Sequence, residues 1–213
     1  MKPNPKRRSS EASQAAIFAA AAEEFSERGF EAGGVDRIAA KAGVNKAMLY
    51  YHFGSKRGLY VEVLRDMFRA VGARVRAIAD GPGSAPEKLQ RWVATIIEEA
   101  AARPWFPPIM LRELASGAPR FDPETFAMMN TVFGGVRDII AQGQREDAFG
   151  DVDPLLTHLT IMPPILTFFA RQRVLVAKGI TTGVLEPRQI EGFVAHMQRT
   201  ALRIVHKEGP QLS

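Results

Sequence analysis

The chain has 213 residues, of which 46% are hydrophobic and 24% charged, with a net charge of +5 and no cysteine. This apolar content is enough for a folded core, and the lack of cysteine excludes disulfide scaffolds and thiolate chemistry. No run of about 18 uncharged apolar residues marks a membrane span, and the basic start lacks the apolar segment of a secretory signal, so we expect a cytoplasmic protein.

The positive charge is concentrated in the first third of the chain. Residues 1–74 hold 13 Lys or Arg against 8 Asp or Glu, whereas residues 75–213 hold 15 of each kind. A localised excess predicts that the N-terminal part binds a polyanion, of which nucleic acid is the commonest.

Helical periodicity dominates, and no segment shows the alternation of a β-strand. Ile17, Ala21 and Phe25 repeat at helical spacing before Gly29, which predicts a first helix over residues 10–29.

Two short helices follow the first. Val35 and Ile38 lie on one apolar face of a helix that is expected to end at Gly43. Asn45 is placed to cap the next helix, predicted over residues 46–52.

Ser55 is placed to cap a long helix over residues 56–79, which a Gly/Pro cluster at 81–86 terminates. The pairs Pro107-Pro108 and Pro163-Pro164 are expected to start, kink or unwind their helices. An all-α fold of about nine helices is predicted, the last five at residues 86–102, 105–117, 122–146, 154–178 and 187–207.

Two short helices joined by a tight glycine turn form the helix-turn-helix arrangement. On the second helix, Lys46 can reach phosphate or guanine, and Tyr50, Tyr51 and His52 offer hydroxyl and ring donors. Lys56 lies at the next helix N-terminus, where free N–H groups attract anions. Adjacent tyrosines cannot share a helix face, so the alternative that one of them is partly core stays open.

The run GVNKAMLYYHFGSK at residues 43–56 resembles the signature of the TetR family of transcriptional regulators, and the similarity extends over about residues 10–60. The resemblance implies a homodimer with a DNA-binding head over residues 1–56, a connecting helix over 57–79 and a ligand-binding and dimerisation domain over 80–213. It implies a repressor that leaves double-stranded operator DNA when a small-molecule effector binds, with no cofactor or metal.

The resemblance also assigns roles on the second motif helix. It makes Tyr50, His52 and Lys56 phosphate contacts. The positions that it places toward base edges are Lys46, Ala47, Met48 and Tyr51.

Three positions depart from the family pattern. Gly33-Gly34 stands where many relatives have Thr or Ser, so a hydroxyl cap is missing. Ala47-Met48 replaces Gly-Thr, and Arg57 replaces an acidic residue. The operator sequence therefore cannot be transferred from a relative.

An apolar effector pocket is predicted among the helices at 105–117, 122–146 and 154–178, where aromatic and methionine side chains are dense. Its predicted lining residues are Trp105, Met110, Arg112, Phe133, His158, Met162 and Phe169. The alternative is that these aromatic residues form ordinary core and that the polar ones face water.

The last two helices are predicted to form a four-helix interface with their copies across a two-fold axis. The alternative is that their apolar residues fill a monomer core. The residues concerned are Leu155, Leu159, Phe168, Phe169, Phe193, Val194, Met197, Ala201, Leu202 and Val205.

Two other functions stay open, an architectural DNA-binding protein without an effector and an all-α enzyme. The sequence contains no phosphate-binding glycine loop, nucleophile elbow or metal-binding pair, so no catalytic activity is expected. The basic residues 6–8 are expected to be solvated, with a minor-groove arm as the alternative.

Overall fold

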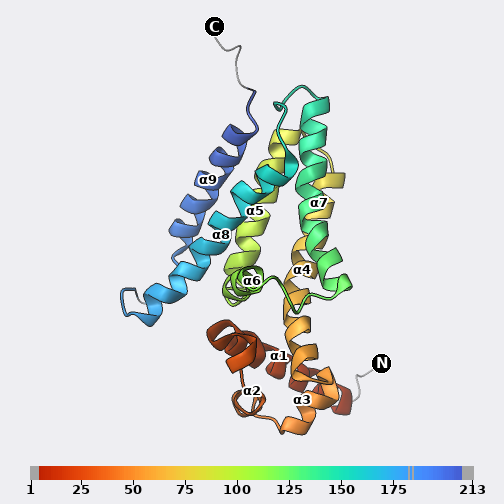
Figure 1. Cartoon of the computed structure of the whole chain (residues 1–213), viewed down its shortest axis with the longest axis vertical. Coiled ribbons are helices and arrows are strands. Elements are labelled where there is room, and N and C mark those ends of the chain that lie inside the picture. The colour runs from red at the N-terminus through yellow and green to blue at the C-terminus, as the bar shows by residue number, and fades with distance from the viewer. Residues whose placement is uncertain (1–4, 182, 184, 208–213) are drawn as a thin grey trace. The chain divides into compact units, whose positions relative to one another are not determined.

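The computed structural model describes residues 5–181, 183 and 185–207 (Figure 1). Over these residues the chain forms nine helices and no strand, which confirms the predicted all-α fold. The helices are α1 Pro5–Ala32, α2 Val35–Ala42, α3 Lys46–Phe53, α4 Lys56–Asp80, α5 Ala85–Ala102, α6 Phe106–Ala115, α7 Pro123–Arg145, α8 Pro154–Ala177 and α9 Pro187–Ile204. Within the described ranges, no helix combines the length and apolar character needed to cross a membrane.

The chain divides into two compact units, and the boundary falls within α4. The head unit is Met1–Met67 with Trp105–Thr125, and the body unit is Phe68–Pro104 with Phe126–Ser213. This head unit extends beyond the DNA-binding domain predicted over residues 1–56, because it also includes residues 57–67 of α4 and residues 105–125, which contain α6. The side chains of the basic residues 6–8 lie outside the described ones.

The head unit is organised around the apolar face of α1. Ile17, Ala21 and Phe25 are fully buried, together with Ile38 of α2 and Leu49 of α3. α1 contacts α2, α3 and α6. Helices as short as α2 and α3 are unstable alone, so this packing holds them in place.

Gly29 breaks α1. Its φ of 73° and ψ of −179° are non-helical, and this positive φ favours glycine. The predicted stop at Gly29 is therefore confirmed, although one more turn follows it to Ala32.

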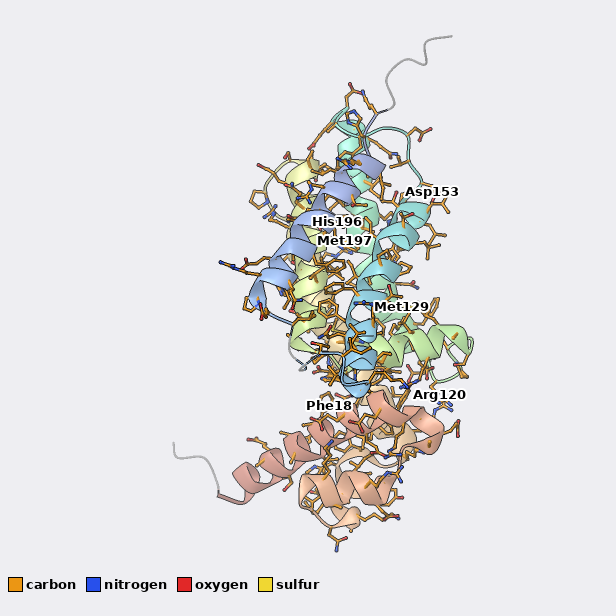
Figure 2. The ribbon with its side chains drawn as sticks, turned by 90° about the vertical axis from the view of Figure 1, so that its left-hand side faces the viewer. Phe18, Arg120, Met129, Asp153, His196 and Met197 are labelled. Carbon is orange, nitrogen blue, oxygen red and sulfur yellow. The ribbon has the colours of Figure 1, made fainter. Side chains whose placement is uncertain are left out.

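In the body unit, α5 lies against both α8 and α9 (Figure 1). Phe169, Met197, Ala201 and Val205 are at most 3% exposed and fill the body's own core. Their assignment to a dimer interface is therefore wrong. Figure 2 labels Met197 on α9 beside His196, which is exposed.

The two proline pairs behave differently. Pro107 and Pro108 lie in the first turn of α6, where a missing N–H costs no hydrogen bond. Pro163 and Pro164 lie inside α8, which continues through both, so the helix neither starts nor unwinds at this pair. Asp153 caps α8 by accepting the Leu156 N–H at 2.8 Å (Figure 2 labels Asp153).

Candidate DNA-binding site

A tight turn joins α2 to α3. Gly43 adopts a left-handed φ of 66°, and its N–H donates to the carbonyls of Ala39 and Ala40. The Asn45 side chain then caps α3 by accepting the Ala47 N–H at 2.9 Å. Both local predictions, the stop at Gly43 and the cap at Asn45, are confirmed.

The N-terminus of α2 is capped from another helix. Gly34 offers no side chain, as predicted, and its N–H donates to the Glu24 carboxylate of α1 at 3.0 Å. Arg37 donates to the same oxygen at 2.7 Å. Burial raises the pKa of Glu24, but these hydrogen bonds outweigh it and leave the pKa below its ordinary value. An acid of α1 thus replaces the missing hydroxyl.

One side of α3 is anchored and the other faces outward. Leu49 is fully buried, whereas Lys46 and Ala47 are exposed. Tyr51 is 78% exposed and Tyr50 44%, so neither tyrosine belongs to the core. These four exposed positions are all ones that the sequence predicts to contact DNA.

Lys46 has an intramolecular partner that the sequence analysis missed. Its ammonium lies 2.9 Å from the carboxylate of Asp36, which is on α2. The hydrogen bond to Asp36 raises the pKa of Lys46 above its ordinary value. Both side chains are exposed, so a phosphate group can compete for this lysine.

The other three predicted contacts are half-buried. Met48 and His52 are only partly exposed, and the Nε2 atom of His52 has no hydrogen-bond partner among the described residues. Lys56 donates to the Glu31 carbonyl at 3.1 Å and lies 4.6 Å from the centre of the Phe30 ring. Its ammonium is therefore held by the end of α1.

Glu113 of α6 joins three parts of the head. It is 1% exposed and accepts hydrogen bonds from the Tyr60 hydroxyl at 2.7 Å and from Arg120 at 3.0 Å. Arg120, labelled in Figure 2, also pairs with Glu31. Burial and the Glu113 carboxylate raise the pKa of Tyr60, so the phenol stays protonated. The sequence carries no local signal for this network.

Three of the predicted effector residues belong to the head unit. Trp105 packs edge-on against Phe18 at 6.0 Å between ring centres, and Met110 is buried. The Arg112 guanidinium donates to the Phe25 and Ser26 carbonyls at 3.2 and 2.6 Å. A cation at the C-terminal end of a helix stabilises it, so these contacts favour a structural role for Arg112.

The other four predicted effector residues belong to the body unit. His158 and Phe133 make an edge contact at 5.4 Å between ring centres. Phe169 is buried and Met162 half-buried. Because the seven residues are divided between the two units, the effector pocket as a whole stays a prediction.

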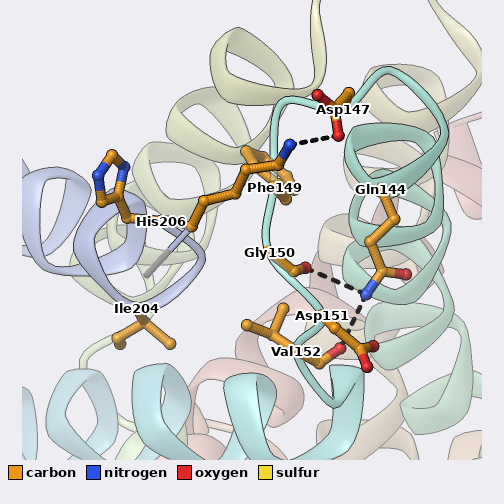
Figure 3. A pocket seen from close by; sticks show the side chains of 9 residues that line it. Gln144, Asp147, Phe149, Gly150, Asp151, Val152, Ile204 and His206 are labelled. Atoms are coloured by element: carbon orange, nitrogen blue, oxygen red, sulfur yellow. Dashed lines mark hydrogen bonds and ion pairs between the residues drawn. The ribbon is translucent and has the colours of Figure 1, made fainter. Parts of the chain in front are cut away.

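A surface hollow of about 780 Å³ lies elsewhere in the body (Figure 3). Segment 144–152 and the end of α9 line it, and the Gln144 amide donates to the Val152 carbonyl at 3.1 Å on one side. Lys207 and Asp147, which both line the hollow, form an ion pair. None of the seven predicted effector residues lines this hollow.

A tight turn between two short helices, with an exposed basic and aromatic face on the second, defines a helix-turn-helix DNA-binding protein. Residues 17–63 match the model of the bacterial regulatory proteins of the tetR family. The transcriptional repressor NicS of Pseudomonas putida is 33% identical over 158 residues, which cover 72% of this chain and 73% of NicS. The chain belongs to the tetR family.

Other relatives agree with this assignment. The regulator RutR of Escherichia coli is 28% identical over 153 residues, covering 71% of this chain and 70% of RutR. The structure of the ketosteroid regulator KstR2 of Mycobacterium tuberculosis has a TM-score of 0.68 at 25% identity and covers 92% of this chain and 95% of that one. A tetR-family regulator from Marinobacter aquaeolei, with a TM-score of 0.72 at 19% identity and 95% and 100% coverage, shares the fold. The chain is therefore a DNA-binding transcriptional regulator.

Proposed function

We propose that this regulator is a repressor that binds operator DNA as a homodimer and leaves it when a small-molecule effector binds. The outward face of α3 carries the DNA-binding part of the proposal. Lys46, Tyr50 and Tyr51 are exposed together on a helix that the buried Leu49 fixes in place. A lysine with two phenol groups is suited to phosphate and base edges in a major groove.

The exposed face of α8 supports the homodimer. Leu155, Leu156 and Leu159 are 51, 65 and 54% exposed, and a cluster of exposed leucines marks a protein interface. In a homodimer, the two α3 helices would enter two half-sites of the operator whose centres lie about 34–36 Å apart. Leu155 and Leu159 thus remain in the proposed interface, whereas the buried residues of α9 do not.

Effector release follows from linkage between two binding equilibria. An effector that binds the DNA-free form better shifts the population away from DNA, and DNA weakens effector binding by the same factor. The name of the relative NicS, a transcriptional repressor, supports the repressor part of the proposal.

Fluorescence anisotropy tests the proposal. Labelled duplexes that tile the DNA upstream of the chain's own gene are titrated with the protein at several salt concentrations. We expect one duplex to bind far more tightly than the rest. Compounds that raise the melting temperature in a thermal-shift screen should release that duplex in the same concentration range. Equal affinity for every duplex would contradict sequence-specific binding, and specific binding that no stabilising compound relieves would contradict effector release.

A further inference from the structure

Two buried nitrogen atoms of the body unit lack hydrogen-bond partners among the described residues. They are Nε1 of Trp92, on α5, and Nδ1 of His158, on α8. The two rings meet edge to face with their centres 6.0 Å apart. Buried polar atoms in proteins are nearly always hydrogen-bonded, so two unpartnered nitrogen atoms on neighbouring rings indicate a site that a polar group fills.

Apolar groups of α7 surround this pair. The Phe133 ring of α7 packs against His158, with their centres 5.4 Å apart. Gly135 lies so close that an added Cβ would be 3.5 Å from the Trp92 nitrogen. Its neighbour Gly134 is buried, yet an added Cβ there would meet no atom within 4 Å. Open space therefore lies beside α7 at Gly134.

Nearby charged groups are engaged elsewhere. Lys88 of α5 donates to the Ala79 carbonyl at 2.9 Å and to Gln142 at 2.8 Å. Arg74 of α4 pairs with Glu99 at 2.7 Å. Burial also lowers the pKa of His158 to about 4, so the imidazole is neutral at pH 7. The pair thus favours a neutral partner over an anion.

We propose that Trp92 and His158 form the polar end of the effector site and bind the oxygen of a neutral carbonyl or hydroxyl group on an otherwise apolar molecule. The Trp92 indole can only donate. A carbonyl oxygen can accept from the indole N–H and from a protonated Nδ1 at once, whereas a hydroxyl can accept from the indole and donate to an unprotonated Nδ1. This proposal rests on the proposed effector-responsive function.

The chain has two tryptophans, Trp92 and Trp105, so the full-length Trp105→Phe protein carries a single indole. Its ¹⁵N-labelled indole signal is followed by NMR during titration with acetophenone, with benzyl alcohol and with ethylbenzene, which lacks the oxygen. We expect both oxygen compounds to move the Trp92 signal downfield and to slow its exchange with water. Ethylbenzene should move it much less.

The Trp92→Phe variant removes only the N–H, and its preference for acetophenone over ethylbenzene should fall about tenfold. The unsubstituted protein, which keeps the Trp92 N–H, is the reference and should show the full preference. If Trp92→Phe does not fold, the indole titration alone decides. The assignment would be overturned if neither oxygen compound moved the indole signal, or if ethylbenzene moved it equally. It would also be overturned if a bound water stayed on the indole. Those outcomes leave operator binding and its release by other compounds intact, so they are distinguishable from failure of the proposed function.

Discussion

Helices α3 and α8 both expose large side chains, but the chemistry of the two faces differs. α3 exposes Tyr50, Tyr51 and the ammonium of Lys46, whereas α8 exposes Leu155 and Leu156. Phenol and ammonium groups form hydrogen bonds and ion pairs to a polyanion. Leucine side chains gain free energy only by leaving water, which requires another apolar surface. Exposure alone therefore does not identify a partner, but exposure combined with side-chain chemistry separates a DNA face from a protein face.

The largest expected effect comes from placing a charge on the α8 face. Leu156→Glu should convert a dimer into a monomer, and apparent operator affinity should fall at least about a hundredfold because the two heads no longer bind together. Light scattering and anisotropy measure the two quantities. Leu114→Glu is the matched control, since Leu114 is also about half exposed, at 51%, but lies on α6. A dimer of unchanged affinity in Leu156→Glu would contradict the role given to α8.

His158, on the inner side of α8, should make the free energy of unfolding depend on pH. Burial lowers the pKa of His158 to about 4 from an ordinary value of 6.5, so the unfolded chain binds its proton first as the pH falls. The stabilising contribution is complete above pH 6.5 and is lost as the pH falls from there through 4, by about 3 kcal/mol in total and by about 2 kcal/mol between pH 7 and pH 4.5. Urea unfolding at pH 7 and pH 4.5 measures it.

His158→Phe should remove that part of the pH dependence. His196→Phe should not, because His196 is an exposed residue of α9. Equal pH dependence in the original protein and in His158→Phe would show that the histidine titrates alike in the folded and unfolded states.

The helix ends of this chain are predictable because their signals are local. Asn45 and Ser55 each accept a backbone N–H within three residues, at 2.9 Å in both cases, and Gly43 stops α2 where a left-handed residue is needed. Long-range pairing has no such signal. Arg112 donates to carbonyls that precede it by 86 and 87 residues, and a helical pattern does not specify which helix end receives an arginine.

The sequence also does not specify what the apolar faces of α8 and α9 contact. A helical stripe looks alike in sequence whether it faces its own core or another subunit. Met197 and Phe169 therefore resemble interface residues, although both are buried in the body unit. Leu155 and Leu159, predicted from the same pattern, are exposed, and only the three-dimensional packing distinguishes the two sets.

On α3, we expect the exposed ammonium of Lys46 to contact phosphate rather than the base edge that the resemblance assigns to it, so its loss should weaken DNA binding uniformly. Lys46→Ala should lower affinity about tenfold on all sequences and reduce the slope of log affinity against log salt by about one. Lys56→Ala should have the smaller effect, because its ammonium is bound to the Glu31 carbonyl. Anisotropy at several salt concentrations compares the two variants, and a larger loss from Lys56→Ala would reverse this ranking.

The smallest expected effect concerns the partner of Lys46. Asp36 is 80% exposed and holds the lysine at 2.9 Å, so a phosphate must displace a carboxylate that it also repels. Asp36→Asn should therefore strengthen binding to unrelated DNA about threefold at low salt and steepen the salt dependence. Glu23→Gln is the matched control, because Glu23 is another exposed acid of the head and pairs with Lys41 on α2. If both variants strengthen binding equally, the gain reflects net charge alone. A gain confined to Asp36→Asn means that the Asp36 carboxylate restrains Lys46 until the DNA supplies enough other contacts to compete for the lysine.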